Sequence, residues 1–324
     1  NEQLKPVLRE VAAADWTQAT DITIDTQLLS ARANDRYLEF LGDRTGEAKA
    51  YADAPGTPAT KRSLKLLKLQ TSAPAPSDPA KRTELTEILA SLGAMYGEGK
   101  VCPSGPASCR NLDQLSETMR PKYQRFVELA NEGAREFGFA DLGAMWRSGY
   151  DMPPDEFAAV VSQLWGQVKP LYNGMQCYAR GRLAQRYGED KVPAGKPIPA
   201  HLLGNMWAQT WNKVYDDILK PYPDASIESA DRELKKQQWN AVRMTKSAET
   251  FYTSIGFPAL PQTFWERSML VRPRDREVVC HASAWDMDDA NDVRIKMCMQ
   301  PNEEDLFTIY HELGHVYYYL AYNK

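Results

Sequence analysis

The sequence predicts a mainly α-helical protein with one short β-hairpin close to its last helix. Apolar residues recur at the spacing of a helix face in most segments before residue 187. Residues 276–298 stand apart, because they are rich in Val and Ile and alternate polar with apolar side chains, as strands do. The chain shows no internal repeat, heptad run, Gly-rich phosphate loop or G-x-S-x-G motif.

Residues 1 to about 100 are expected to form helices separated by helix-breaking segments. Helical stripes are predicted at 4–11, 26–51 and 83–95, and Pro- and Gly-rich connections at 53–58 and 74–79. Residues 63–69 form a short basic amphipathic segment. That segment could dock a partner, although a solvated helix face is the more common use of such a pattern.

The middle of the chain predicts two further long helices, at 123–137 and 155–187. Pro153 and Pro154 precede the second of these, where helices often begin. Residues 201–211 are aromatic and apolar with few charges, so they are expected to be buried or to line a cavity. Gln209 lies among them, and its amide either bonds to the backbone or binds a ligand.

The predicted hairpin consists of strands at 276–280 and 292–298 joined by a turn at 286–291. The first strand continues into the small-residue segment His281–Trp285, which another backbone could approach closely. An exposed strand edge beside a metal-binding helix would hold an extended peptide by strand addition. An ordinary hairpin explains the same pattern equally well.

The strongest chemical motif is His311-Glu312-Leu313-Gly314-His315, which fits the zinc-peptidase pattern H-E-x-x-H. Histidines four residues apart lie on one face of a helix and can share a zinc ion. Glu312 is placed to handle the proton of a water activated by that ion. Asn302 is expected to cap this helix, with Asp305 acting as the acidic half of a capping box. The alternative is an amphipathic helix carrying two ordinary surface or core histidines.

The composition is that of a soluble globular protein, with 324 residues, 43% hydrophobic and 25% charged residues and a net charge of −4. Neither nucleic acid nor an anionic membrane is indicated as a partner, and no apolar run is long enough for a membrane span. No signal-peptide pattern follows Asn1, so we expect a cytosolic protein or one whose signal has been removed.

The five cysteines bear on the choice between a cytosolic protein and one exported with its signal removed. Cys102 and Cys109 bracket a short loop, and Cys280 and Cys298 flank the predicted hairpin. Each pair could close a small disulfide loop, leaving Cys177 free, although five reduced thiols fit the spacing too. No N-glycosylation sequon occurs in the chain. Two possible disulfides and the lack of a glycosylation sequon together favour an exported bacterial protein.

Several separated motifs resemble the angiotensin-converting enzyme family, the peptidyl-dipeptidases A. The motifs that carry the resemblance occur in the family's order and are Met145–Ser148, Pro199–Trp211, Phe264–Trp265, Arg276–Asp286, Arg294–Cys298, His311–His315 and Tyr318–Leu320. The resemblance extends over essentially the whole chain but covers only the first half or so of the family's catalytic domain. It implies a zincin-like, elongated helical ellipsoid with a deep central channel. Residues 1–100 would form an N-terminal helical lid, and residues 101–324 the first part of the peptidase scaffold.

The resemblance also implies a role for each site residue. His311 and His315 would be zinc ligands, and Glu312 the general base and later the proton donor. Ala282 and Ala284 would pair with the substrate backbone, and His281 would bond a substrate carbonyl. Gln209 matches a glutamine that binds the substrate's C-terminal carboxylate. A single-residue carboxypeptidase branch of the family has an arginine there, so Gln209 favours the release of C-terminal dipeptides.

Further expectations follow from the same resemblance. The substrates would be peptides with a free C-terminal carboxylate, and peptide-mimic inhibitors would compete with them. Chloride could act as an activator, with Tyr150 at a chloride-binding position. Disulfides are implied for Cys102–Cys109 and Cys280–Cys298, which favours a secreted or periplasmic protein.

The sequence departs from the family in two places. The third zinc ligand, a glutamate some two dozen residues after the second histidine, would fall beyond Lys324, and activity requires it. The connection at 110–119 is shorter than in the family. A non-catalytic, peptide-binding truncated homologue is therefore the main alternative to an enzyme, and an oligopeptidase or single-residue carboxypeptidase of the superfamily is another.

Overall fold

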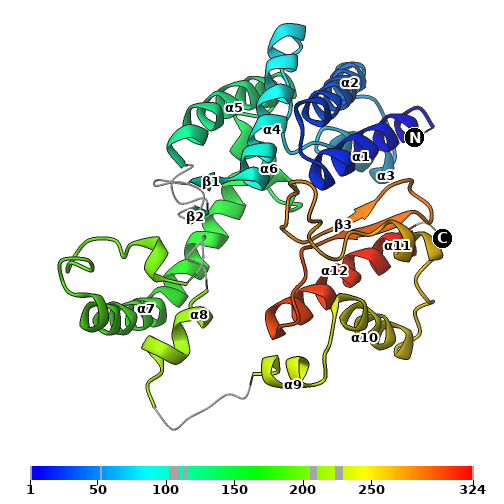
Figure 1. Ribbon diagram of the computed structural model, residues 1–324. Coiled ribbons are helices and arrows are strands. Elements are labelled where there is room, and N and C mark those ends of the chain that lie inside the picture. The colour runs from blue at the N-terminus through cyan, green and yellow to red at the C-terminus, as the bar shows by residue number, and fades with distance from the viewer. Residues whose placement is uncertain are drawn as a thin grey trace. The chain divides into compact units, whose positions relative to one another are not determined.

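The computed structural model describes residues 2–51, 53–101, 110–111, 116–204, 210–222 and 229–322 (Figure 1). The chain forms two compact units. Unit 1 combines residues 1–99, 117–142 and 228–324, and unit 2 combines residues 100–116 and 143–227. The mainly helical class with a short hairpin beside the last helix is confirmed. The ellipsoid, the channel and the lid role of residues 1–100 stay predictions.

Unit 1 begins with helices whose first turns follow from local sequence. The helices are α1 (Leu4–Thr20), α2 (Ile24–Lys49), α3 (Pro58–Leu67), α4 (Pro79–Glu98) and α5 (Ser116–Glu136). The hydroxyl of Thr23 accepts the N–H of Thr26, whose own hydroxyl accepts the N–H of Thr23, so the two residues form a capping box for α2. Asp78 caps α4 by accepting the N–H of Lys81, and Pro79 occupies the first helical position.

The C-terminal part of unit 1 consists of α9 (Asp231–Lys236), α10 (Ala241–Ser254), α11 (Gln262–Arg267), β3 (Ser283–Asp286), β4 (Val293–Lys296) and α12 (Glu303–Tyr322). One continuous core joins these elements apart from α9. Met244 of α10, Ile295 of β4 and Leu313 of α12 are each 0% exposed within it. This core holds α12 against the hairpin, which is how the fold positions the predicted site.

The predicted hairpin exists, but its first strand begins later than the sequence indicates. Strand β3 is Ser283–Asp286, and residues 276–280 are not a strand. Those residues bond instead to the end of α1: Ile22 donates its N–H to the carbonyl of Glu277 at 2.9 Å, and Val279 donates to Ala19 at 2.9 Å. The α4 helix also approaches closely, since a Cβ on Gly97 would lie 3.0 Å from the Val279 Cγ2 atom. The N-terminal helices therefore occupy the backbone groups that a longer ladder would need.

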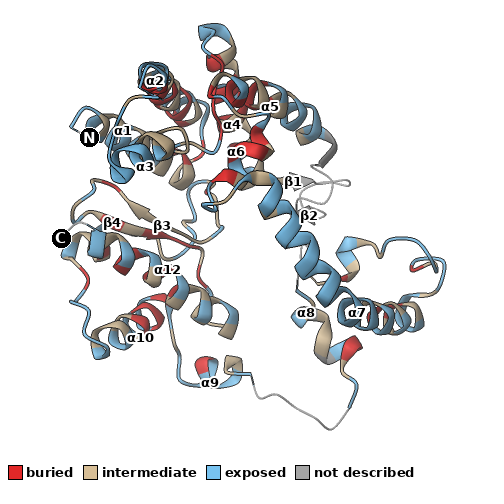
Figure 2. Cartoon of the chain, turned by 180° about the vertical axis from the view of Figure 1, so that it is seen from behind, coloured by how far each residue is buried: buried red, intermediate tan, exposed pale blue. Residues whose placement is uncertain are grey.

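Unit 2 contains β1 (Lys100–Val101), β2 (Arg110–Asn111), most of α6 (Leu142–Ser148), α7 (Pro154–Tyr187), a 3₁₀ turn (Ala200–Leu202), α8 (Asn212–Val214) and a π-helical turn (Tyr215–Leu219). Its small core packs Ala179 and Leu183 of α7 against Val192, Leu203 and Ile218. Much of α7 is exposed, as the pale blue helix in Figure 2 shows, including Leu164, Trp165 and Leu171. Among the described residues, no helix has both the length and the apolar composition needed to cross a bilayer.

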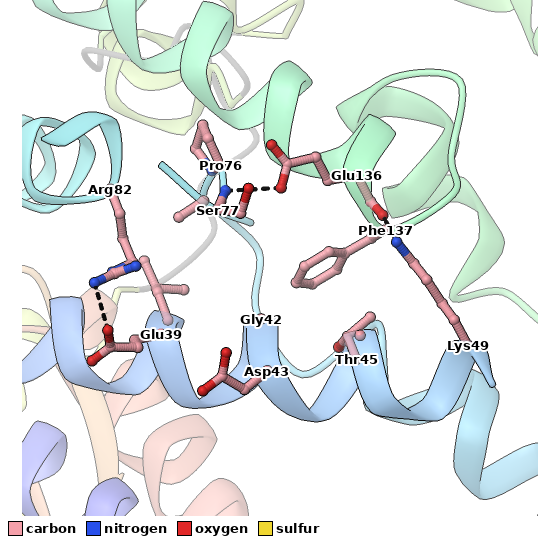
Figure 3. Close-up of a pocket in the computed structure, with 13 residues that line it drawn as sticks. Glu39, Gly42, Asp43, Thr45, Lys49, Pro76, Ser77, Arg82, Glu136 and Phe137 are labelled. Carbon is pink, nitrogen blue, oxygen red and sulfur yellow. Dashed lines mark hydrogen bonds and ion pairs between the residues drawn. The ribbon is translucent and has the colours of Figure 1, made fainter. Parts of the chain in front are cut away.

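A hollow of about 390 Å³ lies in unit 1 between α2, the 75–77 connection and the end of α5 (Figure 3). Ser77 donates its N–H to the Glu136 carboxylate across it at 2.8 Å, and Arg82 donates to Glu39 at 3.0 Å. None of the residues that the sequence predicts for the site lines this hollow. It is therefore separate from the candidate active site.

Candidate active site

Helix α12 begins where the sequence predicts and for the predicted reason. Asn302 accepts the N–H of Asp305 at 2.7 Å through its side-chain oxygen, as an N-cap does. In a capping box, the Asp305 carboxylate would accept the N–H of Asn302. Here it accepts the N–H of Gln300 instead, at 2.7 Å. The acidic residues Glu303, Glu304 and Asp305 fill the first turn, where they complement the helix dipole.

The motif residues of α12 divide between its two faces. Ile309, Leu313 and Val316 are each 0% exposed and anchor the helix in the core. His311 and His315 lie on the exposed face, while Glu312 is only 7% exposed. The helix therefore presents both imidazoles outward and keeps the carboxylate at the edge of the core.

The two imidazoles are oriented toward one another. Their Nε2 atoms are 3.1 Å apart and the ring planes make an angle of 81°. Two zinc–nitrogen bonds of about 2.0–2.1 Å at a tetrahedral angle would separate the nitrogens by roughly 3.3 Å. The pair therefore fits two ligand positions of one zinc ion with little movement. The described residues contain no group of three His, Cys, Asp or Glu side chains that could hold a metal.

Strand β3 lies beside α12 and has one unpaired edge among the described residues. It pairs antiparallel with β4 in the register Ser283–Lys296 to Asp286–Val293. On its other side, β4 contacts residues 268–270: Ile295 accepts the N–H of Met269 at 2.9 Å and donates its own N–H to the Ser268 hydroxyl at 3.1 Å. Both peptide groups of Ile295 thus point away from β3.

This register fixes which residues of β3 face the unpaired edge. Ala284 is the partner of Ile295, so its N–H and C=O also point away from the ladder. Backbone direction alternates along a strand, so Ala282 presents its groups on the same side as Ala284. These are the two residues whose backbones the sequence predicts to pair with a peptide.

His281 lies at the start of this edge, and its side chain is exposed. Its Nδ1 atom is 3.5 Å from the Tyr96 hydroxyl, which comes from the end of α4. Burial raises the pKa of the Tyr96 phenol above its ordinary value. The N-terminal helices therefore contribute a side chain next to the predicted substrate-binding histidine.

The structure also adds a residue that the sequence reasoning missed. Lys296 is 2% exposed, and its ammonium donates to the carbonyls of Val279 at 2.7 Å and His281 at 2.6 Å. Burial lowers the pKa of Lys296 to about 8, and the charge of Glu312 opposes that shift. In the sequence, Lys296 is a polar residue in an alternating strand pattern, and such a residue is expected to face solvent.

The remaining predicted residues are placed as follows. Gln209, Cys102 and Cys109 lie outside the described residues. Tyr150 belongs to unit 2 and is 63% exposed, with its ring stacked on Phe157 at 4.1 Å between centroids. The disulfide predicted between Cys280 and Cys298 is present, and Cys177 is a free, exposed thiol.

Comparison with known proteins gives a consistent result. A family model described as Angiotensin-converting enzyme (Peptidase M2) matches residues 1–120 and 112–324. The two matched segments meet at the connection that the sequence predicts to be short. Angiotensin-converting enzyme of the rabbit Oryctolagus cuniculus is 37% identical over 354 residues, which cover 99% of this chain and 27% of the rabbit protein. That of Theromyzon tessulatum is 32% identical over 357 residues, covering 99% of this chain and 56% of the relative.

A third relative is the angiotensin-converting enzyme-like protein Ace3 of Mus musculus, 33% identical over 345 residues. The alignment with it covers 98% of this chain and 46% of the mouse protein. The chain thus spans about a quarter to a half of the length of these relatives, while nearly all of it is matched.

Proposed function

The chain belongs to the angiotensin-converting enzyme family, and we propose that it carries the zinc-binding helix and the substrate-binding edge of a zinc peptidase that releases C-terminal dipeptides. One observation carries this proposal. The Nε2 atoms of His311 and His315 are 3.1 Å apart on the exposed face of α12, next to the nearly buried Glu312. That arrangement matches the needs of metal-assisted peptide hydrolysis.

Each group in the site has a chemical task. Bound zinc would polarise the scissile carbonyl and make water acidic enough to attack at neutral pH. His311 and His315 would hold the ion through their Nε2 atoms. Glu312 would accept the proton of the attacking water and pass it to the leaving amine. Its position at the core edge keeps most of the side chain away from bulk water.

The peptide would lie along β3 as an added antiparallel strand. Ala282 and Ala284 supply outward-facing N–H and C=O groups, and neither has a side chain large enough to block the approach. His281 would donate to a substrate carbonyl. Gln209, on the family resemblance, would bind the C-terminal carboxylate and set the length of the released product at two residues.

The same proposal includes an oxidising location and a chloride effect. The Cys280–Cys298 disulfide supports a secreted or periplasmic protein, since such bonds persist outside the reducing cytosol. Tyr150 would contribute to a chloride site. The bacterial origin rests on the sequence pattern alone.

Hydrolysis of a blocked tripeptide tests the catalytic role of Glu312. Acetyl-Phe-Ala-Pro offers a free C-terminal carboxylate and releases Ala-Pro if the proposal holds. Glu312→Ala should lower kcat by about 10²–10⁴-fold, the range for a positioned general base. Glu304→Ala, which changes an exposed glutamate in the first turn of the same helix, is the matched control. Release of free proline alone would instead indicate a single-residue carboxypeptidase.

A second candidate is a peptide-binding protein without catalysis. The unpaired edge of β3 among the described residues fits it as well, because strand addition of a peptide needs no metal. This candidate predicts that the tripeptide binds but stays intact, and that Glu312→Ala changes neither result.

A further inference from the structure

Lys296 is an unusual residue for its position. Lysine is almost never fully buried unless it is paired, yet this side chain is 2% exposed at the end of β4. An ammonium group in an apolar region is stable only when its N–H groups have acceptors. Here the acceptors are two backbone carbonyls, those of Val279 and His281, at 2.7 and 2.6 Å.

The location of these carbonyls explains what the lysine does. The β3–β4 ladder ends at the pair Ser283–Lys296. Beyond it, Met297 and Met299 donate their N–H groups to Met269 and Leu270, at 2.7 and 3.1 Å. These N–H groups face the same side as those of Ile295, away from β3, and among the described residues no ladder pair joins residues 279–281 to β4. The Lys296 ammonium continues the bonding to that segment past the last ladder pair.

The two bonds also act on the unpaired edge. In extended backbone, successive peptide groups point in opposite directions, so fixing the carbonyl of His281 on the inner side fixes the outward direction of Ala282. Holding the His281 backbone further restricts where its imidazole can lie. The Cys280–Cys298 bond joins the same two segments through side chains, whereas Lys296 bonds to the backbone carbonyls themselves.

We propose that Lys296 is a positioning residue that holds the His281–Ala284 edge in the extended conformation an incoming peptide requires. This role rests on the proposed function, because it assumes that the edge binds substrate. Lys296 does not touch the peptide, since its ammonium is engaged on the β4 side of the segment.

The test compares Lys296→Met, which keeps the side-chain length but removes the donors, with Lys296→Arg, which keeps donors. Lys61→Met, at an exposed lysine on α3, is the matched control. Hydrogen exchange of the full chain is followed by mass spectrometry for fragments covering residues 279–285 and, separately, α10. Removing hydrogen bonds from a charged donor should speed exchange at the edge by about 10- to 100-fold.

The expected result is local. Exchange at 279–285 rises in Lys296→Met, stays slow in α10, and is restored at least partly in Lys296→Arg. The affinity for acetyl-Phe-Ala-Pro falls in the Met variant and not in Lys61→Met. Unchanged exchange at the edge overturns the proposal, and so does an equal rise throughout α10, which would mean general destabilisation.

Failure of the proposed function gives a different signature. A wild-type chain that does not bind the tripeptide contradicts peptide binding at the edge. The exchange comparison between the Met and Arg variants still decides whether Lys296 holds the segment.

Discussion

Proline at Ala284 tests the direction in which the β3 edge presents its peptide groups. The register places the Ala284 N–H on the unpaired side, so Ala284→Pro removes a donor for substrate and no bond to β4. Proline is tolerated on edge strands where its missing N–H would face solvent. Ser283→Pro is the matched variant, because Ser283 faces Lys296 across the ladder.

The expected changes in stability and in peptide affinity depend on which hydrogen-bonding groups each variant leaves unpaired. Ser283→Pro leaves an acceptor on β4 without its donor, at a cost of about 1–3 kcal/mol in the free energy of unfolding. It also removes the bond from the Trp285 indole to the Ser283 hydroxyl, which is 2.9 Å long. Ala284→Pro should cost less, on the order of 1 kcal/mol for backbone restriction. It should nevertheless weaken tripeptide binding about tenfold, which corresponds to the loss of about 1.4 kcal/mol.

Urea unfolding followed by tryptophan fluorescence gives the stability of both variants, and fluorescence titration with acetyl-Phe-Ala-Pro gives the affinity. The expected pattern is a stable Ala284→Pro chain that binds poorly and a destabilised Ser283→Pro chain. Equal destabilisation by both, or normal binding by Ala284→Pro, would refute the assignment of the edge.

Three other predictions concern the surroundings of the site. The buried Tyr317 hydroxyl has no hydrogen-bond partner within the described part of the chain, whereas the Tyr252 hydroxyl donates to the Tyr310 carbonyl at 2.9 Å. In urea unfolding, Tyr317→Phe should therefore stabilise the fold and Tyr252→Phe should destabilise it, each by about 1 kcal/mol. Replacing Cys280 and Cys298 together by serine should lower stability by about 3 kcal/mol, from the entropy of an open loop, while Cys177→Ser leaves it unchanged; an unaffected double variant would contradict this. Hydrogen bonds and charge from Arg294, and from Arg267, lower the pKa of Asp292. The ionised carboxylate therefore stabilises the fold above its unfolded pKa, and this stabilisation is lost as the pH falls through the folded pKa. Asp292→Asn should flatten the acid limb of a plot of stability against pH, and curves identical to the wild type would disprove this.

Most of the helical structure follows from local sequence, because periodic apolar stripes and caps act over a few residues. The pattern at 4–11 predicts α1, and Asn302 predicts the beginning of α12. The outward-facing histidine pair follows equally from a spacing of four residues on one helix.

The parts that the sequence does not reveal depend on distant partners. Residues 276–280 have a strand-like composition, but two of their backbone groups bond to Ala19 and Ile22, at and just after the C-terminal end of α1, which no local pattern shows. The alternating pattern predicts a solvent-facing position for Lys296. Only the tertiary arrangement brings two backbone carbonyls to its ammonium. The Tyr96–His281 contact joins residues 185 positions apart, beyond the reach of any spacing argument.

The most direct test of the central claim is a calorimetric titration of the chain with Zn²⁺. Because the described residues supply two ligands and no third, we expect weak zinc binding that is equal in the wild-type and Glu312→Ala chains, since Glu312 is not a ligand. We expect no binding in His311→Ala or His315→Ala, since each removes one of the paired Nε2 atoms. Wild-type chains that take up no zinc, or histidine variants that bind it as the wild type does, would contradict the account.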